Sequence, residues 1–333
     1  MPVSVPLSLL DLSRVNRGES VAEGIARSVR LAQTADGLGY HRLWFAEHHN
    51  APNIASSATA LVIGHVAGQT QNLRLGAGGI MLPNHSPLVI AEQFGTLETL
   101  YPGRIDLGLG RAPGTDGQTM RALRRDGHEA ERFPSDVLEL HAYLSDQTRV
   151  AGVNAYPGAG THVPLYILGS SLFGAQLAAQ FGLPYAFASH FAPAALNEAA
   201  QIYRETFDPS GPLAGPAAKP HFIAAANVIA ADDAATAHEQ RRRAEDGWLD
   251  AFLNRGSRRP FSPEDLVAVR QHPQAQQILR MLERTFVGTQ AEVTDRLAAF
   301  VEEVQADELI LVNLAPSEEH QRRTLELLAP HPG

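Results

Sequence analysis

The sequence lacks cysteine and has few basic residues. With no cysteine among 333 residues, disulfides, thiolate nucleophiles and thiolate metal sites are excluded. The 27 Lys and Arg residues are outnumbered by 36 Asp and Glu residues, which gives a formal charge of −9. Nucleic acids and anionic membranes attract an extended basic surface, so we expect neither as a main partner. A small-molecule substrate is the favoured partner.

Long hydrophobic runs and nucleotide-binding motifs are also missing. No run has the length of a membrane span, and the start, MPVSVPLSLLDLSR, lacks the basic and apolar regions of a secretory signal. We therefore expect a cytoplasmic location. The chain contains neither a GxGxxG motif nor a P-loop. At 44% hydrophobic residues it has enough apolar material for a sizeable core, and we expect one domain over residues 1–333.

Eight short apolar runs alternate with segments of helical period. Such runs, with little internal alternation, are typical of buried parallel strands, and eight of them favour a closed (β/α)8 TIM barrel within the α/β class. An open doubly wound sheet is the alternative. Capping boxes at Ser20/Glu23 and Thr289/Glu292 predict two helix starts. The runs are VPLSLLDL (5–12), RLWFAE (42–47), RLGAGGIML (74–82), RIDLGLG (104–110), PLYILG (164–169), PYAFAS (184–189), HFIAAANVIA (221–230) and DELILVN (307–313).

Two connections are longer than bare loops. They span 111–134 after the fourth strand and 246–288 after the seventh. Connections of this length are usually functional or contain helices of their own. The second one includes RGSRRPFSPED, which is rich in charge and helix breakers, and we expect it to be a mobile lid.

The stretch FAEHHN (45–50) ends the second run with a carboxylate and two histidines. Barrel active sites lie at the C-terminal ends of the strands, so Glu47, His48 and His49 are candidate catalytic residues. If strand geometry persists, Glu47 and His49 point one way and His48 the other. We expect acid/base chemistry or ligand hydrogen bonding and no metal site, because three or four converging ligands are not evident. Helix capping or loop packing is the alternative.

Glycines are concentrated in the third run, LGAGGIMLPNHSP (75–87). Because glycine weakens a strand, Gly78 and Gly79 suggest a flat ligand near the backbone, and we expect a strained or cis peptide between them. A β-bulge or a close strand–helix contact would also explain them.

Two features predict an anion grip on neighbouring strands. Arg111 follows the fourth run in GRIDLGLGRAPGT (103–115). It could bind a phosphate or a carboxylate of a ligand, or it could form a structural ion pair. In the fifth, Gly169-Ser170-Ser171 leads into a helix that begins near Leu172. The free amides of that first turn suit an anion, although a serine there is also an ordinary N-cap.

Taken together, these segments resemble the bacterial luciferase-like family of flavin-dependent monooxygenases, and are most similar to its single-chain, alkanal-monooxygenase-like branch. The resemblance is carried by WFAEHHN, by GAGGIMLPNHSPLVIAEQFGTLETLYPGRIDLGLGRAPGT, by LGSSLFGAQLAAQFGLPYAFASHF and by FVGTQAEVTDRLAAF. It implies a barrel, usually dimeric, that uses reduced FMN and dioxygen to oxidise a small organic substrate such as an aldehyde or alkane. A separate flavin reductase commonly supplies the reduced FMN.

The resemblance also implies roles for individual residues. His48 is the implied acid/base beside the flavin, in the Glu-His-His set with Glu47 and His49. Gly78 and Gly79 match the cis peptide under the flavin ring. The implied phosphate contacts are Arg111, Ser171 and, on a weaker match, Arg121, and the cofactor-binding set as a whole is Gly78, Gly79, Arg111, Arg121, Leu168, Gly169, Ser170 and Ser171.

The chain departs from the luciferases at two positions. Gly110 stands where luciferases carry a reactive cysteine, and Ser170 replaces an acidic residue. We expect the substrate pocket to include Asp11, His190 and Phe191. Two alternatives to the monooxygenase are a deazaflavin-dependent dehydrogenase on the same barrel and a flavin-binding protein without turnover.

Overall fold

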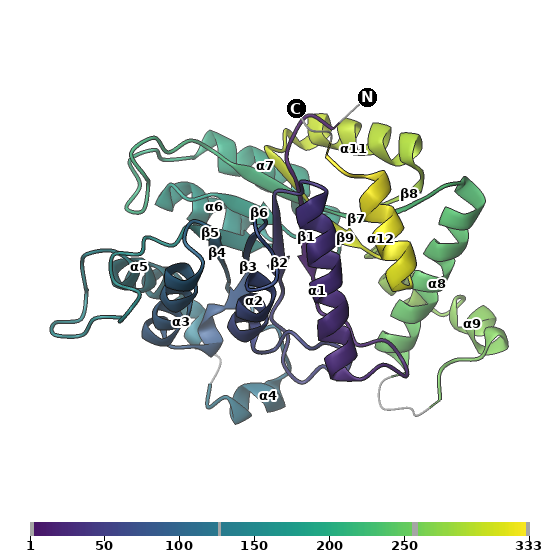
Figure 1. Cartoon of the computed structure of the whole chain (residues 1–333), viewed down its shortest axis with the longest axis horizontal. Coiled ribbons are helices and arrows are strands. Elements are labelled where there is room, and N and C mark those ends of the chain that lie inside the picture. Colours follow the sequence, from purple (N-terminus) through teal and green to yellow (C-terminus); the bar gives the residue numbers. More distant parts are fainter. Residues whose placement is uncertain (1–2, 126–127, 255–258, 331–333) are drawn as a thin grey trace.

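The computed structural model describes residues 3–125, 128–254 and 259–330, and in these residues eight parallel strands close into a barrel (Figure 1). Strand β9 pairs with β1, and β6 pairs with β7, so the sheet has no open edge at the seam. The predicted barrel is confirmed, and the open doubly wound sheet is wrong. The barrel strands are β1 (Leu7–Asp11), β2 (Arg42–Phe45), β3 (Arg74–Met81), β4 (Ile105–Gly110), β5 (Leu165–Gly169), β6 (Tyr185–Phe187), β7 (Phe222–Ala231) and β9 (Glu308–Asn313).

A further strand, β8 (Thr285–Thr289), lies outside the eight predicted strands. It pairs with the C-terminal half of β7, from Asn227 to Ala231. The short strand β6 pairs only with the N-terminal part of β7, so this half is free to pair with β8. It was not predicted because five residues between helices form no extended apolar run. The connection expected over 246–288 therefore contains a strand.

The helices form the outer layer of the barrel (Figure 1). Both predicted capping boxes are present, at the starts of α1 and α11. The apolar residues of α11 are buried along one face, whereas Val21 at the start of α1 is 55% exposed, so the buried face of α1 begins after its first residues. The outer helices are α1 (Val21–Gly37), α2 (Thr59–Ala67), α3 (Pro87–Leu100), α5 (Phe133–Leu144), α6 (Leu172–Phe181), α7 (Leu196–Glu205), α11 (Gln290–Val304) and α12 (Glu318–Leu327).

Both long connections contain helices. The first carries α4 (Gly117–Ala122), which projects at the edge of the molecule opposite the two chain ends (Figure 1). In the second, α8 (Ala234–Leu253) continues past residue 246, and α9 (Pro263–Val269) and α10 (Pro273–Arg280) follow. Buried Leu249, Ala275 and Ile278 pack α10 against α8. The start of RGSRRPFSPED, residues 255–258, lies outside the described residues.

The barrel interior is apolar toward its middle and ionic toward the N-terminal ends of its strands. Arg42 binds Asp106 at 2.8 Å and Glu308 at 2.9 Å, and its guanidinium also donates to the Tyr166 hydroxyl at 2.7 Å. His221 Nε2 lies 3.1 Å from the same Glu308 carboxylate. These residues come from β2, β4, β5 and β9 and the start of β7, so they tie opposite sides of the barrel together.

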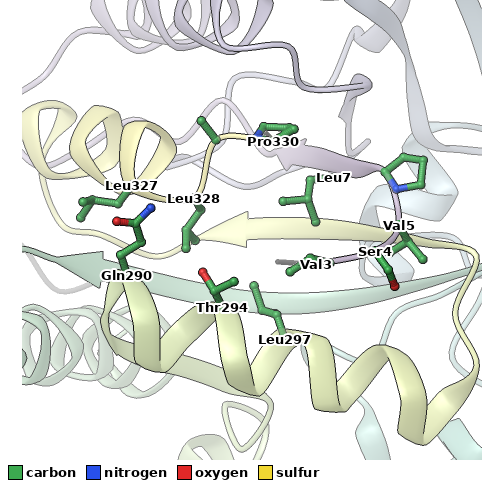
Figure 2. Close-up of a pocket in the computed structure, with 12 residues that line it drawn as sticks. Val3, Ser4, Val5, Leu7, Gln290, Thr294, Leu297, Leu327, Leu328 and Pro330 are labelled. Carbon is green, nitrogen blue, oxygen red and sulfur yellow. The ribbon is translucent and has the colours of Figure 1, made fainter. Parts of the chain in front are cut away.

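Figure 2 shows a groove outside the barrel, between α11, the end of α12 and the N-terminal segment. It holds about 350 Å³ and is lined mainly by apolar side chains, among them Leu297 and Leu328. None of the predicted site residues lines it. In the described residues, no helix is both long enough and apolar enough to cross a bilayer.

Candidate functional site

The Glu47 carboxylate is the centre of a hydrogen-bonded cluster at the barrel mouth. Its Oε1 lies 2.7 Å from His49 Nε2 and 2.8 Å from His85 Nε2, and its Oε2 accepts the Met81 amide at 3.2 Å. Glu47 is only 1% exposed. Burial alone would raise the pKa of Glu47, but the hydrogen bonds from His49 and His85 lower it to about 2. The carboxylate in turn raises the pKa of His49.

His85 was missed by sequence reasoning. It lies 38 residues from Glu47, in the NHSP segment after β3, where a histidine at a strand end was the available signal. The ligand atoms of Glu47, His49 and His85 lie within 4.8 Å of one another, so this set could hold a divalent cation. The absence of a metal site stays a prediction, although His85 converges here as a third possible ligand that was not evident in the sequence. The two hydrogen bonds to Glu47 account for the geometry without an ion.

His48 lies apart from that cluster. Strand β2 ends at Phe45, so the strand geometry assumed through Glu47 does not persist, although Glu47 and His49 still meet and His48 does not join them. The Nδ1 atom of His48 is buried and has no hydrogen-bond partner among the described residues. Burial and the nearby charge of Arg14 lower the pKa of His48, which favours a neutral imidazole.

The peptide bond between Gly78 and Gly79 is cis, as predicted. Each glycine also fills a position with no space for a side chain. A Cβ on Gly78 would lie 2.8 Å from Leu10 Cδ1, and one on Gly79 would lie 2.7 Å from the Gly108 carbonyl oxygen. The register of β3 against β4 shifts between Ala77 and Ile80. The β-bulge considered as an alternative is therefore present, whereas the close contacts of the two glycines are with neighbouring strands and not with a helix. Together they explain the glycines without a ligand.

Arg111 and the start of α6 lie together. The Arg111 guanidinium carbon is 4.1 Å from the centroid of the Phe173 ring in the first turn of that helix. Ser171 is the N-cap, yet its side chain makes no capping hydrogen bond, and it is exposed. The Tyr185 hydroxyl on β6 donates a hydrogen bond to the Ser171 carbonyl at 3.0 Å, which fixes the turn that precedes α6. Exposed cation, free hydroxyl and uncapped amides form a place where an anion fits.

The other predicted cofactor residues are less closely grouped. Leu168 packs inside the barrel, the Gly169 carbonyl accepts the Ala188 amide at 2.9 Å, and Ser170 is exposed. Arg121 lies in the last turn of α4 and is exposed. In the described parts of the chain its side chain makes no hydrogen bond or ion pair, so no such interaction joins it to Arg111.

Of the three residues expected in the substrate pocket, Asp11 is the last residue of β1, and His190 and Phe191 follow β6. Asp11 accepts the Ser13 amide at 2.8 Å, and the His190 and Phe191 rings meet edge to face with centroids 4.7 Å apart. Phe191 is partly exposed. Burial and the charge of Arg14 lower the pKa of His190 to about 3, so this imidazole is neutral. Arg14 itself was not predicted, and its side of the mouth was recognised only through the structure.

Comparison with known proteins places this geometry in a family. A family model described as luciferase-like monooxygenase matches residues 6–308. The chain is 48% identical to the Bacillus subtilis protein YvbT over 97% of this chain and 95% of that protein. It is 46% identical to a luciferase-like monooxygenase of Escherichia coli strain K12, over 92% of this chain and 91% of that protein. The structure of apo-MsnO8 is 33% identical and superposes with a TM-score of 0.84 over 98% of this chain and 97% of that one. The chain therefore belongs to the luciferase-like monooxygenase family.

Proposed function

We propose that this protein is a flavin-dependent monooxygenase that uses reduced FMN and dioxygen to oxidise a small organic substrate. The observation that carries the proposal is the anion site formed by Arg111 and the uncapped start of α6, on the same barrel mouth as His48. A relative in Bacillus subtilis, 39% identical over 55% of this chain, is named N-acetyl-S-alkylcysteine monooxygenase. That name supports oxygen insertion into a small molecule.

The residues present fit an FMN phosphate. A phosphate carries two negative charges and several acceptor oxygens, and it favours arginine and helix N-terminal amides. Arg111, the Ser171 hydroxyl and the first amides of α6 would hold it, and Arg121 on α4 is a further proposed phosphate contact. Leu168, Gly169 and Ser170 would lie along the cofactor, and Gly78 and Gly79 would lie beneath its ring. Reduced FMN, when bound, would supply the electrons that activate dioxygen.

His48 is the proposed general acid/base. Its buried Nδ1 has no partner in the described structure, and its neutral state leaves one ring nitrogen free to accept a proton. Glu47 would stay ionised and hold His49 and His85 in place through its hydrogen bonds. The residues that neighbour His48 at the mouth would therefore keep fixed positions. The mouth residues thereby position the reactants and control where a proton can go.

Several further parts of the proposal concern partners and context. We propose that a separate flavin reductase delivers reduced FMN, that the protein is a homodimer in the cytoplasm, and that it is closest to the single-chain, alkanal-monooxygenase-like branch. The deazaflavin alternative has one supporting observation. An F420-dependent secondary alcohol dehydrogenase shares the fold at 15% identity with a TM-score of 0.70, as does an FMN-bound Baeyer–Villiger monooxygenase of Pseudomonas putida at 17% identity with a TM-score of 0.71.

The test is cofactor binding by the pure protein. Titration with FMN, riboflavin and a deazaflavin, each oxidised and reduced, should show tightest binding for reduced FMN. Arg111→Ala should weaken FMN binding by about 1.5 to 3 kcal/mol, the scale of a hydrogen bond to a charged group. Riboflavin, which lacks the phosphate, should bind the variant and the wild type alike. An equal loss of affinity for FMN and riboflavin shows that Arg111 does not hold the phosphate. Preferential binding of the deazaflavin supports the alternative of a deazaflavin-dependent dehydrogenase.

A further inference from the structure

Arg14 has an unusual place for an arginine. It follows β1, and its backbone forms an isolated bridge with Ile54, in the segment after the Glu-His-His residues. Its carbonyl oxygen accepts a hydrogen bond from Arg27. The side chain is partly buried, and its guanidinium carbon lies 5.7 Å from the centroid of the Trp248 ring on α8. The backbone therefore fixes Arg14 at the mouth, and α8 covers one face of its charge.

The Arg14 guanidinium has no anionic partner in the described structure. Comparable arginines are paired: Arg27 binds Glu19 at 3.0 Å, and Arg30 binds Glu318 at 2.6 Å. Within residues 3–125, 128–254 and 259–330, no carboxylate oxygen lies within 4.0 Å of Arg14, and its side chain donates no hydrogen bond. Asp11 attracts it from farther away, with one oxygen committed to the Ser13 amide. A partly buried cation without a partner is costly unless a ligand completes it.

Two neutral imidazoles accompany this cation. The Nδ1 atoms of His48 and His190 are both buried without partners in the described residues, and the charge of Arg14 lowers the pKa of both rings. Asn227 on β7 donates to the His190 carbonyl at 2.6 Å and so fixes that loop, while its own Oδ1 has no partner. A cation flanked by neutral imidazoles can bind an oxyanion, because each ring can donate a hydrogen bond to it. Trp248 adds an apolar surface for the rest of a ligand.

This site is distinct from the phosphate grip. Arg111 and Ser171 follow β4 and β5, whereas Arg14 follows β1 and His190 follows β6. In the closed barrel β1 is separated from β4 by β2 and β3, and from β5 by β9, β7 and β6. An anion at Arg14 is therefore a second one, bound across the mouth from the first.

We propose that Arg14, with His48 and His190 beside it, recognises a carboxylate on the substrate, so that the substrate class is a small organic acid with an apolar portion against Trp248. This inference rests on the proposed function, because the bound carboxylate is a substrate only if the protein is an enzyme. The same guanidinium could instead face an anionic form of the reduced flavin ring, and the experiment distinguishes the two sources.

The test compares matched probes that differ only in charge. Hexanoate and benzoate are titrated against hexanamide and benzamide, with and without FMN, and binding is followed by calorimetry and by the fluorescence of Trp248. The wild type should prefer each carboxylate by about tenfold or more, the scale of a charged hydrogen bond. Arg14→Gln should abolish the preference, and Arg14→Lys should keep part of it. The matched control is Arg323→Gln, since Arg323 is an exposed arginine on α12 that pairs with Asp232.

The outcomes separate the inference from the proposed function. If the wild type shows no carboxylate preference, or if folded Arg14→Gln and Arg14→Lys proteins keep it in full, the inference is wrong. If Arg14→Gln weakens only reduced FMN, Arg14 serves the flavin ring, and the substrate assignment is again wrong. If the protein binds no FMN while the carboxylate preference depends on Arg14, the anion site stands and the proposed flavin function fails.

Discussion

At the residue scale, two adjacent histidines have opposite environments. His49 Nε2 is hydrogen-bonded to the Glu47 carboxylate at 2.7 Å, whereas the Nδ1 of His48 is buried without a partner in the described structure. The pKa of His49 is raised and that of His48 is lowered. At neutral pH the pair therefore offers one imidazole that favours the proton and one that does not.

His48→Ala should impair turnover far more than FMN affinity, because a proton donor or acceptor acts on the reacting atoms while the phosphate grip provides binding. Rate losses of about 10² to 10⁴ are typical for a general acid/base. The measurements are FMN affinity, reoxidation of reduced flavin and product yield, with His49→Ala as the comparison. Loss in His49→Ala alone shows that the assignment within the pair is wrong, and loss in neither removes the acid/base role.

Glu47→Gln should lower the pKa of His49, because the hydrogen-bonded carboxylate is what raises it. A raised folded-state pKa contributes stability below the unfolded value, near 6.5, and that contribution is lost as pH rises through the folded pKa. Titration of the imidazole signals by NMR measures the shift directly. The control is Glu302→Gln, an exposed position on α11, which should leave His49 unchanged. An unchanged His49 titration in Glu47→Gln contradicts the prediction.

At the element scale, the region expected to be a lid is a packed helical unit. Leu249 on α8 is fully buried and contacts the cluster formed with Ala275 and Ile278 on α10. Trp248, the next residue back, faces Arg14 at the mouth. The helices α8 to α10 thus share a small apolar core, and Trp248 connects them to the barrel mouth. Any lid motion would therefore move these helices together.

Leu249→Ala should destabilise this unit by about 2 to 5 kcal/mol, the usual cost of a large-to-small change in a core. Hydrogen exchange should quicken in α8 to α10 and stay unchanged in the barrel strands. Val267→Ala on α9 is the control, because Val267 is 69% exposed. Uniform quickening across the chain shows that the unit is not separate. In the wild type, FMN should slow exchange in α8 to α10, and equal exchange with and without FMN removes the lid hypothesis.

At the scale of the whole molecule, the ionic cluster inside the barrel couples stability to pH. Burial alone would raise the pKa of Glu308, but the hydrogen bond from His221 and the charge of Arg42 lower it. A lowered carboxylate pKa contributes stability above the unfolded value, near 4.3, and that contribution is lost as pH falls through the folded pKa. The barrel should therefore lose stability on the acid side.

Glu308→Gln should lower the free energy of unfolding at pH 7 by about 3 to 5 kcal/mol, because it leaves Arg42 with one buried carboxylate partner in place of two. The variant should also show a shallower loss of stability below pH of about 4.3. Urea unfolding at several pH values measures both effects. Glu319→Gln, an exposed position on α12, is the control and should keep the wild-type profile. Parallel acid profiles for Glu308→Gln and wild type contradict the argument.

The sequence by itself determined the strand count of the barrel, the capped starts of α1 and α11, the start of α6 at Leu172, and the cis position at Gly78 and Gly79. Each of these follows from neighbours within a few residues, or from a resemblance carried by contiguous motifs. The short strand β8 was not predicted because its five residues between helices form no extended apolar run.

Only the tertiary structure decided which side chains meet at the mouth. Closing the barrel brings His85 after β3 onto Glu47 after β2, and it places Arg14 after β1 beside His190 after β6. These contacts depend on where loops from different strands turn once the sheet has closed, and no hydrophobic period or capping pattern encodes that. The charge of Arg14 and the state of His48 are thus properties of the assembled mouth, because burial and neighbouring charge, which set a pKa, exist only after folding.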